Sequence, residues 1–454
     1  MAVFSIIQKS QLEGAKRLDA EYYQPEYLDL EQKFNTIETK TINEVSKSVV
    51  SFGAYSLTSY IEWEDSGVPY VNVGDIKEGY IDTSNIKHIS EKVDEILKKS
   101  RVNNGQVLLT MAGTIGNAAV AHNLSRHMNA NQAIAKITPI EVSPYYLAAF
   151  LNSKYGLLQT QREIVSSVQA NIFLGPIKKF KVPIFDKKLR GEVENKYRNF
   201  LETLEHSQSL YSQAEKFLLK ELELGDVEEE AGLWSVVQLS EAQATGRIDA
   251  EYYQPKYKEL LAKLEKSNPR LLGELVTMKK GVEPGADAYT DEGKLFIRVS
   301  SISKFGLADK DQKYISEKLY KELKDTYEPK AGEILLTKDA SPGVACVLRG
   351  RREGVVSGGV MRLKIKEKMI DADYLALCIN SVVGQLQVER DAGGSIIAHW
   401  KPDQIKAMQI PVLPETTQSK IAELVRQSHE ARAKAKQLLE EAKHKVEELI
   451  EAIS

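Results

Sequence analysis

The chain has 454 residues, of which 42% are apolar and 28% are charged, and its formal net charge is −3. This composition excludes a collagen-like chain, a wholly disordered chain and a disulfide scaffold. Cys346 and Cys378 are the only cysteines, too few for a four-cysteine zinc site, so we expect a reducing compartment. The sequence contains no signal peptide and no apolar run of 18 residues, which predicts a cytoplasmic protein without a membrane partner.

The first segment, residues 1–35, carries a motif that recurs later in the chain. Residues 17–27 read RLDAEYYQPEY and residues 247–257 read RIDAEYYQPKY, so nine of eleven positions are identical at an offset of 230. The repeated Arg and Asp can pair and the tyrosines can pack, so we interpret the motif as a structural lock rather than an active site. The proline that follows the tyrosines is typical of the first turn of a helix.

Residues 36–186 predict a compact sheet-based α+β module. Segments such as VPYVNVGDI, GQVLLTMAGTIG and NQAIAKITPI alternate apolar and polar residues, or run β-branched, between Gly and Asn turns. One helix is expected at YYLAAFLNS. Residues 187–224 follow as a long helix whose apolar positions alternate steps of four and three, which is the heptad pattern.

The remaining chain repeats this order. Residues 225–265 contain an acidic connector, expected as a surface loop, and the second leading segment. Residues 266–413 form the second sheet module, and residues 414–454 form the second heptad helix. Collinear pairs such as YVNVGDI/FIRVSSI and GQVLLT/GEILLT connect the two modules. The predicted fold is therefore α+β, with two tandem modules separated by a pair of long antiparallel coiled-coil helices in pseudo-two-fold symmetry, each helix roughly 55–60 Å long.

Known catalytic motifs are missing from the sequence. It contains no Gly-x4-Gly-Lys-Ser/Thr phosphate loop, no His-Glu-x-x-His and no paired Cys-x-x-Cys. The Asn-Pro-Pro-Tyr or Asp-Pro-Pro-Tyr tetrapeptide of DNA amino-methyltransferases is also absent. The pair of glycines in Gly-Thr-Ile-Gly, residues 113–116, is interpreted as a tight turn. We therefore predict no catalytic residue, no metal site and no cofactor site in this chain.

A modest positive excess lies in the two sheet modules, where a DNA-binding surface would need it. Residues 36–186 contain 15 Lys and Arg against 14 Asp and Glu, and residues 266–413 contain 24 against 20. We expect the basic and amide side chains of loops to contact DNA, with Lys279 and Lys280 in a basic turn. The candidates are Ser51, Tyr55, Lys77, Asn117, Arg126, Asn129, Asn131, Gln132, Lys178, Lys179, Lys279, Lys280, Arg298, Ser300, Lys304, Lys338, Arg349, Arg351, Arg352 and His399.

The whole arrangement resembles the specificity (S) subunit of Type I restriction–modification systems. The resemblance rests on the tandem modules, the long helices, the RLDAEYYQPEY/RIDAEYYQPKY repeat and the VPIFD and IPVLP module ends. It implies that each module is a target-recognition domain that binds one half of a split double-stranded DNA target, while the helices set the gap. It also implies docking of two methyltransferase subunits and, through them, of restriction subunits, which would carry S-adenosylmethionine, ATP and Mg²⁺.

Two other interpretations remain open at this level. One is a stand-alone DNA modification enzyme with an unrecognised active site. The other is a coiled-coil scaffold whose sheet modules bind peptide or carbohydrate instead of DNA.

Overall fold

The computed structural model describes residues 4–10, 12, 17–52, 60–165, 170–225, 235–308, 312–366, 370–393 and 398–453. The chain divides into two compact units. Unit 1 comprises Met1–Glu205 with Arg432–Ser454, and unit 2 comprises His206–Ala431. Most of the acidic connector predicted at 225–234 lies outside the described residues.

Each leading segment forms the same local structure. The short helices η1 (Ala20–Tyr23) and η5 (Ala250–Tyr253) precede α2 (Pro25–Asn35) and α9 (Pro255–Glu265), and each α-helix begins at its proline. Arg17 Nε donates to Asp19 Oδ1 at 2.6 Å, and Arg247 Nε donates to Asp249 Oδ1 at 2.6 Å. The predicted pairing of Arg and Asp in the repeated motif is thus confirmed in both copies.

The main sheet of unit 1 has four antiparallel strands in the order β2-β8-β5-β6. Its strands are β2 (Ser46–Val50), β5 (Val107–Thr110), β6 (Ala118–Val120) and β8 (Ile134–Pro139). A second sheet has the order β4-β3-β7, with β3 (Val68–Val71), β4 (Lys87–Ile89) and β7 (Asn129–Ala130). A two-stranded sheet joins β1 (Thr39–Thr41) to β9 (Lys181–Pro183). The alternation and β-branched runs of the sequence therefore do form the strands predicted for this module.

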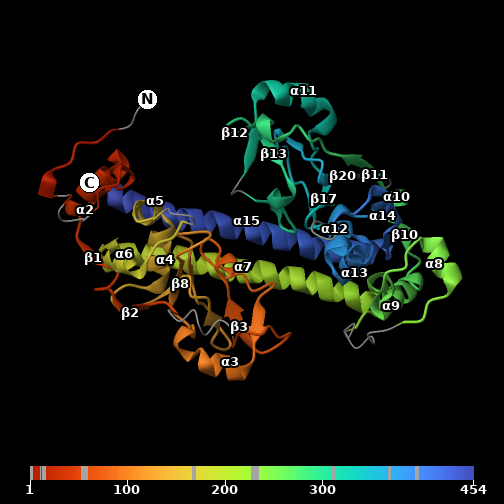
Figure 1. Ribbon diagram of the computed structural model, residues 1–454, viewed down its shortest axis with the longest axis horizontal. Helices are drawn as coiled ribbons and strands as arrows, with labels where there is room; N and C mark the ends of the chain where they lie inside the picture. The colour runs from red at the N-terminus through yellow and green to blue at the C-terminus, as the bar shows by residue number, and fades with distance from the viewer. Residues whose placement is uncertain are drawn as a thin grey trace. The chain divides into compact units, whose positions relative to one another are not determined.

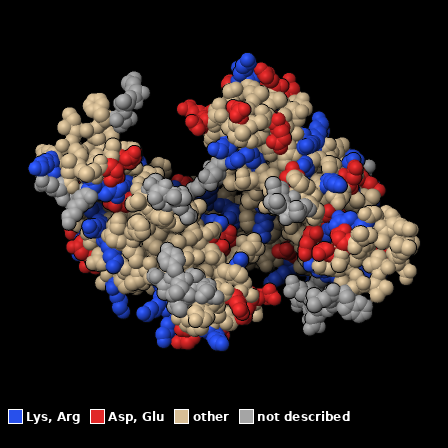
Figure 2. Space-filling view, in the orientation of Figure 1, with Lys and Arg blue, Asp and Glu red and all other residues tan. Residues whose placement is uncertain are grey.

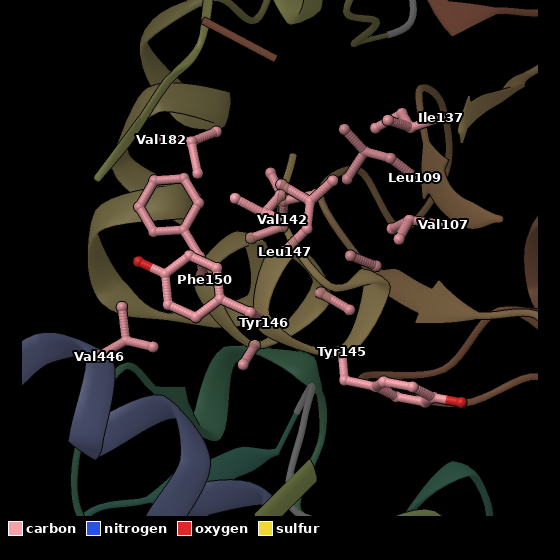
Figure 3. Packing of buried hydrophobic residues seen from close by; sticks show 14 of the residues in the cluster. Val107, Leu109, Ile137, Val142, Tyr145, Tyr146, Leu147, Phe150, Val182 and Val446 are labelled. Atoms are coloured by element: carbon pink, nitrogen blue, oxygen red, sulfur yellow. The ribbon is translucent and has the colours of Figure 1, made fainter. Parts of the chain in front are cut away.

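Helix α4 (Pro144–Asn152) packs on the main sheet of unit 1, as the YYLAAFLNS segment predicts. Leu147 and Phe150 of α4 belong to the same buried cluster as Val107 and Ile137 of the sheet and Val446 of the last helix (Figure 3). The short helices α5 (Lys154–Arg162) and α6 (Leu174–Lys179) follow α4. The core of unit 1 thus joins the sheet, α4 and segments of both long helices.

Unit 2 repeats this topology. Its main sheet has the order β11-β20-β17-β18, with β11 (Val276–Lys280), β17 (Ile334–Thr337), β18 (Ala345–Val347) and β20 (Val360–Ile365). Helix α12 (Ala372–Asn380) takes the place of α4, and α13 (Val382–Asp391) and α14 (Pro402–Ala407) take the places of α5 and α6. The sheet pair β10 (Arg270–Leu271) and β21 (Gln409–Ile410) corresponds to β1 and β9.

The duplication extends to single hydrogen bonds. Tyr146 Oη donates to the carbonyl of Pro183 at 2.8 Å in unit 1, and Tyr374 Oη donates to the carbonyl of Pro411 at 2.9 Å in unit 2. Asn152 and Asn380 each exchange hydrogen bonds with the backbone of a sheet strand, at Ala118 and Ala345 respectively. Both units are therefore copies of one design, as the sequence repeat predicts.

The two long helices are α7 (Lys187–Glu221) and α15 (Glu415–Glu451), each of which contributes to both units (Figure 1). Within unit 1 they run antiparallel, because Lys196 pairs with Glu441 and Lys445 pairs with Glu192. The predicted heptad positions of α7 are all buried. Near the end of α15 the predicted positions match less well: Leu449 is only half-buried and Ile450 is buried in its place, while Ile453 lies beyond the end of the helix and is 53% exposed. A straight α-helix drifts from a strict seven-residue repeat, which accounts for the shift from Leu449 to Ile450.

One local prediction needs correction. Lys279 and Lys280 were expected in a turn, but they end strand β11, which pairs with β20 over five residues. Lys178 and Lys179 lie in the last turn of α6, just before β9 begins at Lys181. In addition, helices α3 (Glu91–Ile96) and α11 (Glu317–Tyr327) occur in segments for which the sequence predicts no helix. Figure 1 shows α11 over β12 (Tyr289–Thr290) and β13 (Lys294–Ile297).

Candidate nucleic-acid interface

In each unit, two parallel strands end at the same edge of the smaller sheet. In unit 1, β3 (Val68–Val71) pairs antiparallel with β4 (Lys87–Ile89) and parallel with β7 (Asn129–Ala130). In unit 2, β13 pairs antiparallel with β16 (Lys313–Ile315) and parallel with β19 (Gly354–Val356). Because neighbouring parallel strands run in one direction, the residues that follow them lie close together.

The strand-end pocket of unit 1 is a cavity of about 280 Å³ at this edge. Asn72 follows β3, Asn131 and Gln132 follow β7, and all three amide side chains line the cavity. Asn131 Oδ1 accepts a hydrogen bond from the backbone of Ala133 at 2.9 Å. Gln132 Oε1 is buried and has no hydrogen-bond partner among the residues that the structure describes. The cavity is therefore lined by neutral amide residues, and Gln132 Oε1, the acceptor without a partner among the described residues, lies buried beside it.

An aromatic pair closes the side of this pocket. Trp63 packs edge-on against Tyr70 with ring centroids 5.3 Å apart, and Lys87 Nζ lies 4.6 Å from the centroid of the Trp63 ring. Tyr70 is buried, whereas Trp63 is 47% exposed.

The strand-end pocket of unit 2 is a cavity of about 540 Å³ at the equivalent edge. Arg298 and Ser300 follow β13, and Ser357 follows β19. Tyr289 and Phe296 form its aromatic side, with ring centroids 5.4 Å apart. This pocket also contains two carboxylates, those of Glu283 and Asp339. It therefore combines a guanidinium group with acidic groups where unit 1 has amides only.

Asp339 connects two further candidates to the pocket of unit 2. Its carboxylate pairs with Lys338 Nζ at 2.5 Å and with His399 Nδ1 at 2.8 Å. Burial by itself would raise the pKa of Asp339, but the hydrogen bonds from Lys338 and His399 hold that pKa below its ordinary value. Asp339 is thus an ionised acceptor at neutral pH. Lys338, only 9% exposed, serves this carboxylate rather than an external phosphate.

Asn129 lies away from any surface that DNA could reach. It is fully buried, and its amide donates to Asp94 Oδ1 at 3.0 Å and accepts from Ser100. Asn129 therefore stabilises the interior of unit 1 through these hydrogen bonds, and we assign it no contact with DNA.

Other candidates lie outside the pockets and are bound to groups of their own unit. Lys77 Nζ donates to the carbonyl of Gly74, and Asn117 Nδ2 donates to that of Ile76, so both stabilise the loop after β3. Arg126 pairs with Glu91 at 2.8 Å. Lys304 Nζ lies 4.8 Å from the centroid of the Tyr211 ring on α7.

The basic loop after β18 is also separate from the pocket of unit 2. Arg349 pairs with Asp373, Arg351 pairs with Glu328 at 3.4 Å, and Arg352 is exposed. Lys279 and Lys280 are exposed on β11, Lys179 is exposed on α6, and Lys178 and Ser51 are half-buried. Tyr55 lies outside the described residues. On the face drawn in Figure 2, Lys and Arg are interspersed with Asp and Glu over both units.

Of the predicted DNA-contact residues, Asn131 and Gln132 line the pocket of unit 1, and Arg298 and Ser300 line the pocket of unit 2. Lys338 and His399 are linked to the pocket of unit 2 because both pair with Asp339, which lines it. Sequence reasoning missed Asn72 and Ser357. The repeat could have identified both, because Asn72 aligns with Arg298, and Ser357 aligns with Asn131, at the same offset of 226. Glu283, Asp339 and Trp63 had no comparable signal.

A comparison with protein families identifies the first module. Residues 35–188 match the family described as the Type I restriction modification DNA specificity domain. The match covers the first module, about a third of the chain. A curated relative, the Type I restriction enzyme EcoBI specificity subunit of Escherichia coli, is 28% identical over 103 residues, which are 22% of this chain and 22% of that protein.

Two solved structures of specificity subunits are among the matches. The S subunit of a Type I restriction–modification system from M. genitalium is 14% identical, with 92% of this chain and 96% of that chain covered and a TM-score of 0.40. The HsdS subunit from Thermoanaerobacter tengcongensis is also 14% identical, with 92% and 95% covered and a TM-score of 0.28.

Among the described residues, no three His, Cys, Asp or Glu side chains are grouped as a metal site would require. Across the same residues, no helix combines the length and the apolar character needed to cross a membrane.

Proposed function

We propose that the chain is the DNA-recognition subunit of a Type I restriction–modification complex, in which each module reads one half of a split target. The observation that carries the proposal is the strand-end pocket, which lies at the same place in both copies of the fold but is lined by different hydrogen-bonding groups. Two modules with the same backbone fold but different hydrogen-bonding side chains at one position could recognise two different DNA sequences.

Phosphate contacts would place each module on the duplex. The positive excess of each module is small, so the interaction depends on individual exposed cations such as Lys179, Lys279, Lys280 and Arg352 rather than on a strong field. Contacts of this kind fix position and orientation but carry no sequence information. Discrimination between DNA sequences would then depend on the two strand-end pockets.

The two long helices would set the distance between the half-sites. Helix α7 has 35 residues and α15 has 37. At about 1.5 Å per residue, either helix exceeds the ~34 Å that separates half-sites one turn of DNA apart. Their antiparallel pairing, with buried side chains at the heptad positions, supports a stiff spacer.

Exposed apolar residues that recur in both leading segments support the docking of two copies of one partner. Leu18 and Ile248 are 85% and 93% exposed, and Ile6 and Val236 are 90% and 79% exposed. Each pair is related by the offset of 230. We assign these two equivalent surfaces to two methyltransferase subunits, which in turn recruit restriction subunits. Those partners would supply S-adenosylmethionine, ATP, Mg²⁺ and all catalysis, so this chain is proposed to be non-catalytic.

The proposal is tested by producing the chain together with methyltransferase subunits and mapping the methylated adenines in genomic DNA. We expect a bipartite consensus with a fixed gap. Insertion of seven residues into α7, with seven matching residues in α15, should change the gap and leave both half-sites unchanged. A map without a bipartite consensus, or a gap unaffected by the insertions, contradicts the proposal.

The other two interpretations give different results. The purified chain alone, incubated with DNA and a labelled methyl donor, should transfer no label; transfer would indicate an enzyme. A mobility-shift assay with and without methyltransferase subunits should show specific binding to a duplex that contains the mapped target. Absence of binding in both samples would favour the scaffold.

A further inference from the structure

The two strand-end pockets share the same backbone hydrogen bond. The amide of Asn131 donates to the carbonyl of Val71 at 2.9 Å, and the amide of Ser357 donates to the carbonyl of Ile297 at 2.8 Å. Both pairs are related by the offset of 226. A base pair placed against this edge would therefore meet the same backbone geometry in either module, and only the side chains would differ.

In unit 1 these side chains are amides. An amide group presents a donor and an acceptor side by side, which matches the N6 donor and N7 acceptor of adenine in the major groove. Gln132 contributes the buried acceptor Oε1 without a partner among the described residues, and Asn72 and Asn131 lie beside it. A neutral amide pocket has no charged group with which to favour guanine.

In unit 2 the same place holds a guanidinium group and carboxylates. Arginine pairs with the O6 and N7 acceptors of guanine, and carboxylates accept from N4 of cytosine, so both types of group match one G·C pair. Arg298 takes the position of Asn72, and Ser357 takes that of Asn131. Glu283 and the ionised Asp339 line the same cavity.

We propose that each strand-end pocket reads one base pair of its half-site, with unit 1 selecting an A·T pair through Asn72, Asn131 and Gln132 and unit 2 selecting a G·C pair through Arg298. This inference rests on the proposed function, because it names the residues and the base class by which each module recognises its half-site.

The decisive variant is Arg298→Gln in the full chain, assembled with methyltransferase subunits and supplied with a randomised duplex library. One half-site should lose its preference for G·C at one position by about 10- to 100-fold and gain a preference for A·T, while the other half-site stays unchanged. The matched control is Arg270→Gln on β10, an arginine of the same unit that pairs with Glu274 outside the pocket. It should leave both half-sites as in the wild type.

Two further variants keep the inference testable if Arg298→Gln does not fold. Ser357→Asn introduces the amide of unit 1 into unit 2 and should weaken G·C preference in the same half-site as Arg298→Gln. Gln132→Ala should relax an A·T position in the opposite half-site. Unchanged consensus in all three variants, or effects of Arg298→Gln and Gln132→Ala in one and the same half-site, overturns the inference. If the wild-type complex itself selects no bipartite sequence, the proposed function fails instead.

Discussion

Ser207 and Ser428 exchange hydrogen bonds across the two long helices. Ser207 Oγ donates to the carbonyl of Ser428 at 2.7 Å, and Ser428 Oγ donates to the carbonyl of Ser207 at 2.7 Å. Both side chains are fully buried at heptad positions where larger apolar residues are usual. Small side chains at this point bring the helices close, and the reciprocal bonds satisfy both hydroxyl groups.

The double variant Ser207→Ala/Ser428→Ala should destabilise unit 2 by about 1–3 kcal/mol, because it removes two buried hydrogen bonds without adding volume. Ser207→Leu should cost at least as much, since a larger side chain does not fit between closely packed helices. Thermal unfolding followed by circular dichroism measures both effects. Ser209→Ala, an exposed serine of the same helix, is the control and should leave the transition unchanged.

Asp94 makes unit 1 sensitive to acid. Burial alone would raise its pKa, but hydrogen bonds from Arg101, Asn129 and His127 lower the pKa below its ordinary value. A carboxyl whose pKa is lower in the folded state stabilises the fold above its unfolded pKa of about 3.9, and this contribution disappears as the pH falls through the folded pKa. Stability should therefore decline below about pH 4.

The variant Asp94→Asn tests this point. It should lower the free energy of unfolding by about 2–3 kcal/mol at pH 7, because charged hydrogen bonds to Arg101 are lost, and it should flatten the decline at low pH. Denaturant titrations at several pH values give both quantities. Glu95→Gln changes the neighbouring carboxylate, which is 63% exposed, and should have little effect. A steep acid decline that persists in Asp94→Asn would assign the effect to another group.

Lys136 makes the stability of unit 1 depend on pH in the alkaline range as well. It is 4% exposed, its ammonium donates to the carbonyls of Lys99 and Arg101, and burial lowers its pKa to about 8. Between about pH 8 and pH 10.4 the unfolded chain binds a proton here that the folded chain does not. The contribution of Lys136 to stability should therefore rise with pH in this window, by on the order of 2–3 kcal/mol.

The comparison of Lys136→Met with Lys47→Met separates this residue from the rest of the chain. Lys47 is exposed on β2 of the same sheet, so its replacement should leave the alkaline rise in place. Lys136→Met should remove the rise. An unchanged pH dependence in Lys136→Met, measured by urea unfolding from pH 7 to pH 10.5, would contradict the assignment.

Lys280 tests the phosphate contacts of unit 2. The substitution Lys280→Ala should weaken binding to all duplexes uniformly and reduce the slope of log affinity against log salt by about 1. Lys258→Ala, an exposed lysine on α9 of the same unit, should preserve the slope. Equal slopes for wild type and Lys280→Ala in a salt titration would exclude this position from the interface.

The sequence predicted the features that repeat and missed those that depend on strand direction. The RxDAEYYQPxY motif and the heptads are local patterns, and both duplicate units and both long helices follow from them. Lys279-Lys280-Gly281 looked like a turn, but pairing with β20 extends the strand to Lys280. Asn72 and Asn131 are 59 positions apart, and only the parallel pairing of β3 with β7 brings them to one pocket. Burial of Asn129 likewise depends on tertiary contacts with Asp94 and Ser100, which a local pattern cannot reveal.

The repeated leading segments also make the gene prone to one particular rearrangement. Recombination between the stretches that encode residues 17–27 and 247–257 would delete 230 codons in frame and fuse the first leading segment to the second module. The shortened product would keep the Arg–Asp pair and the complete second module, but α15 would have lost α7. Two such molecules could pair their α15 helices with each other, so under the proposed function a single genetic event would yield a symmetric dimer whose target is a palindrome.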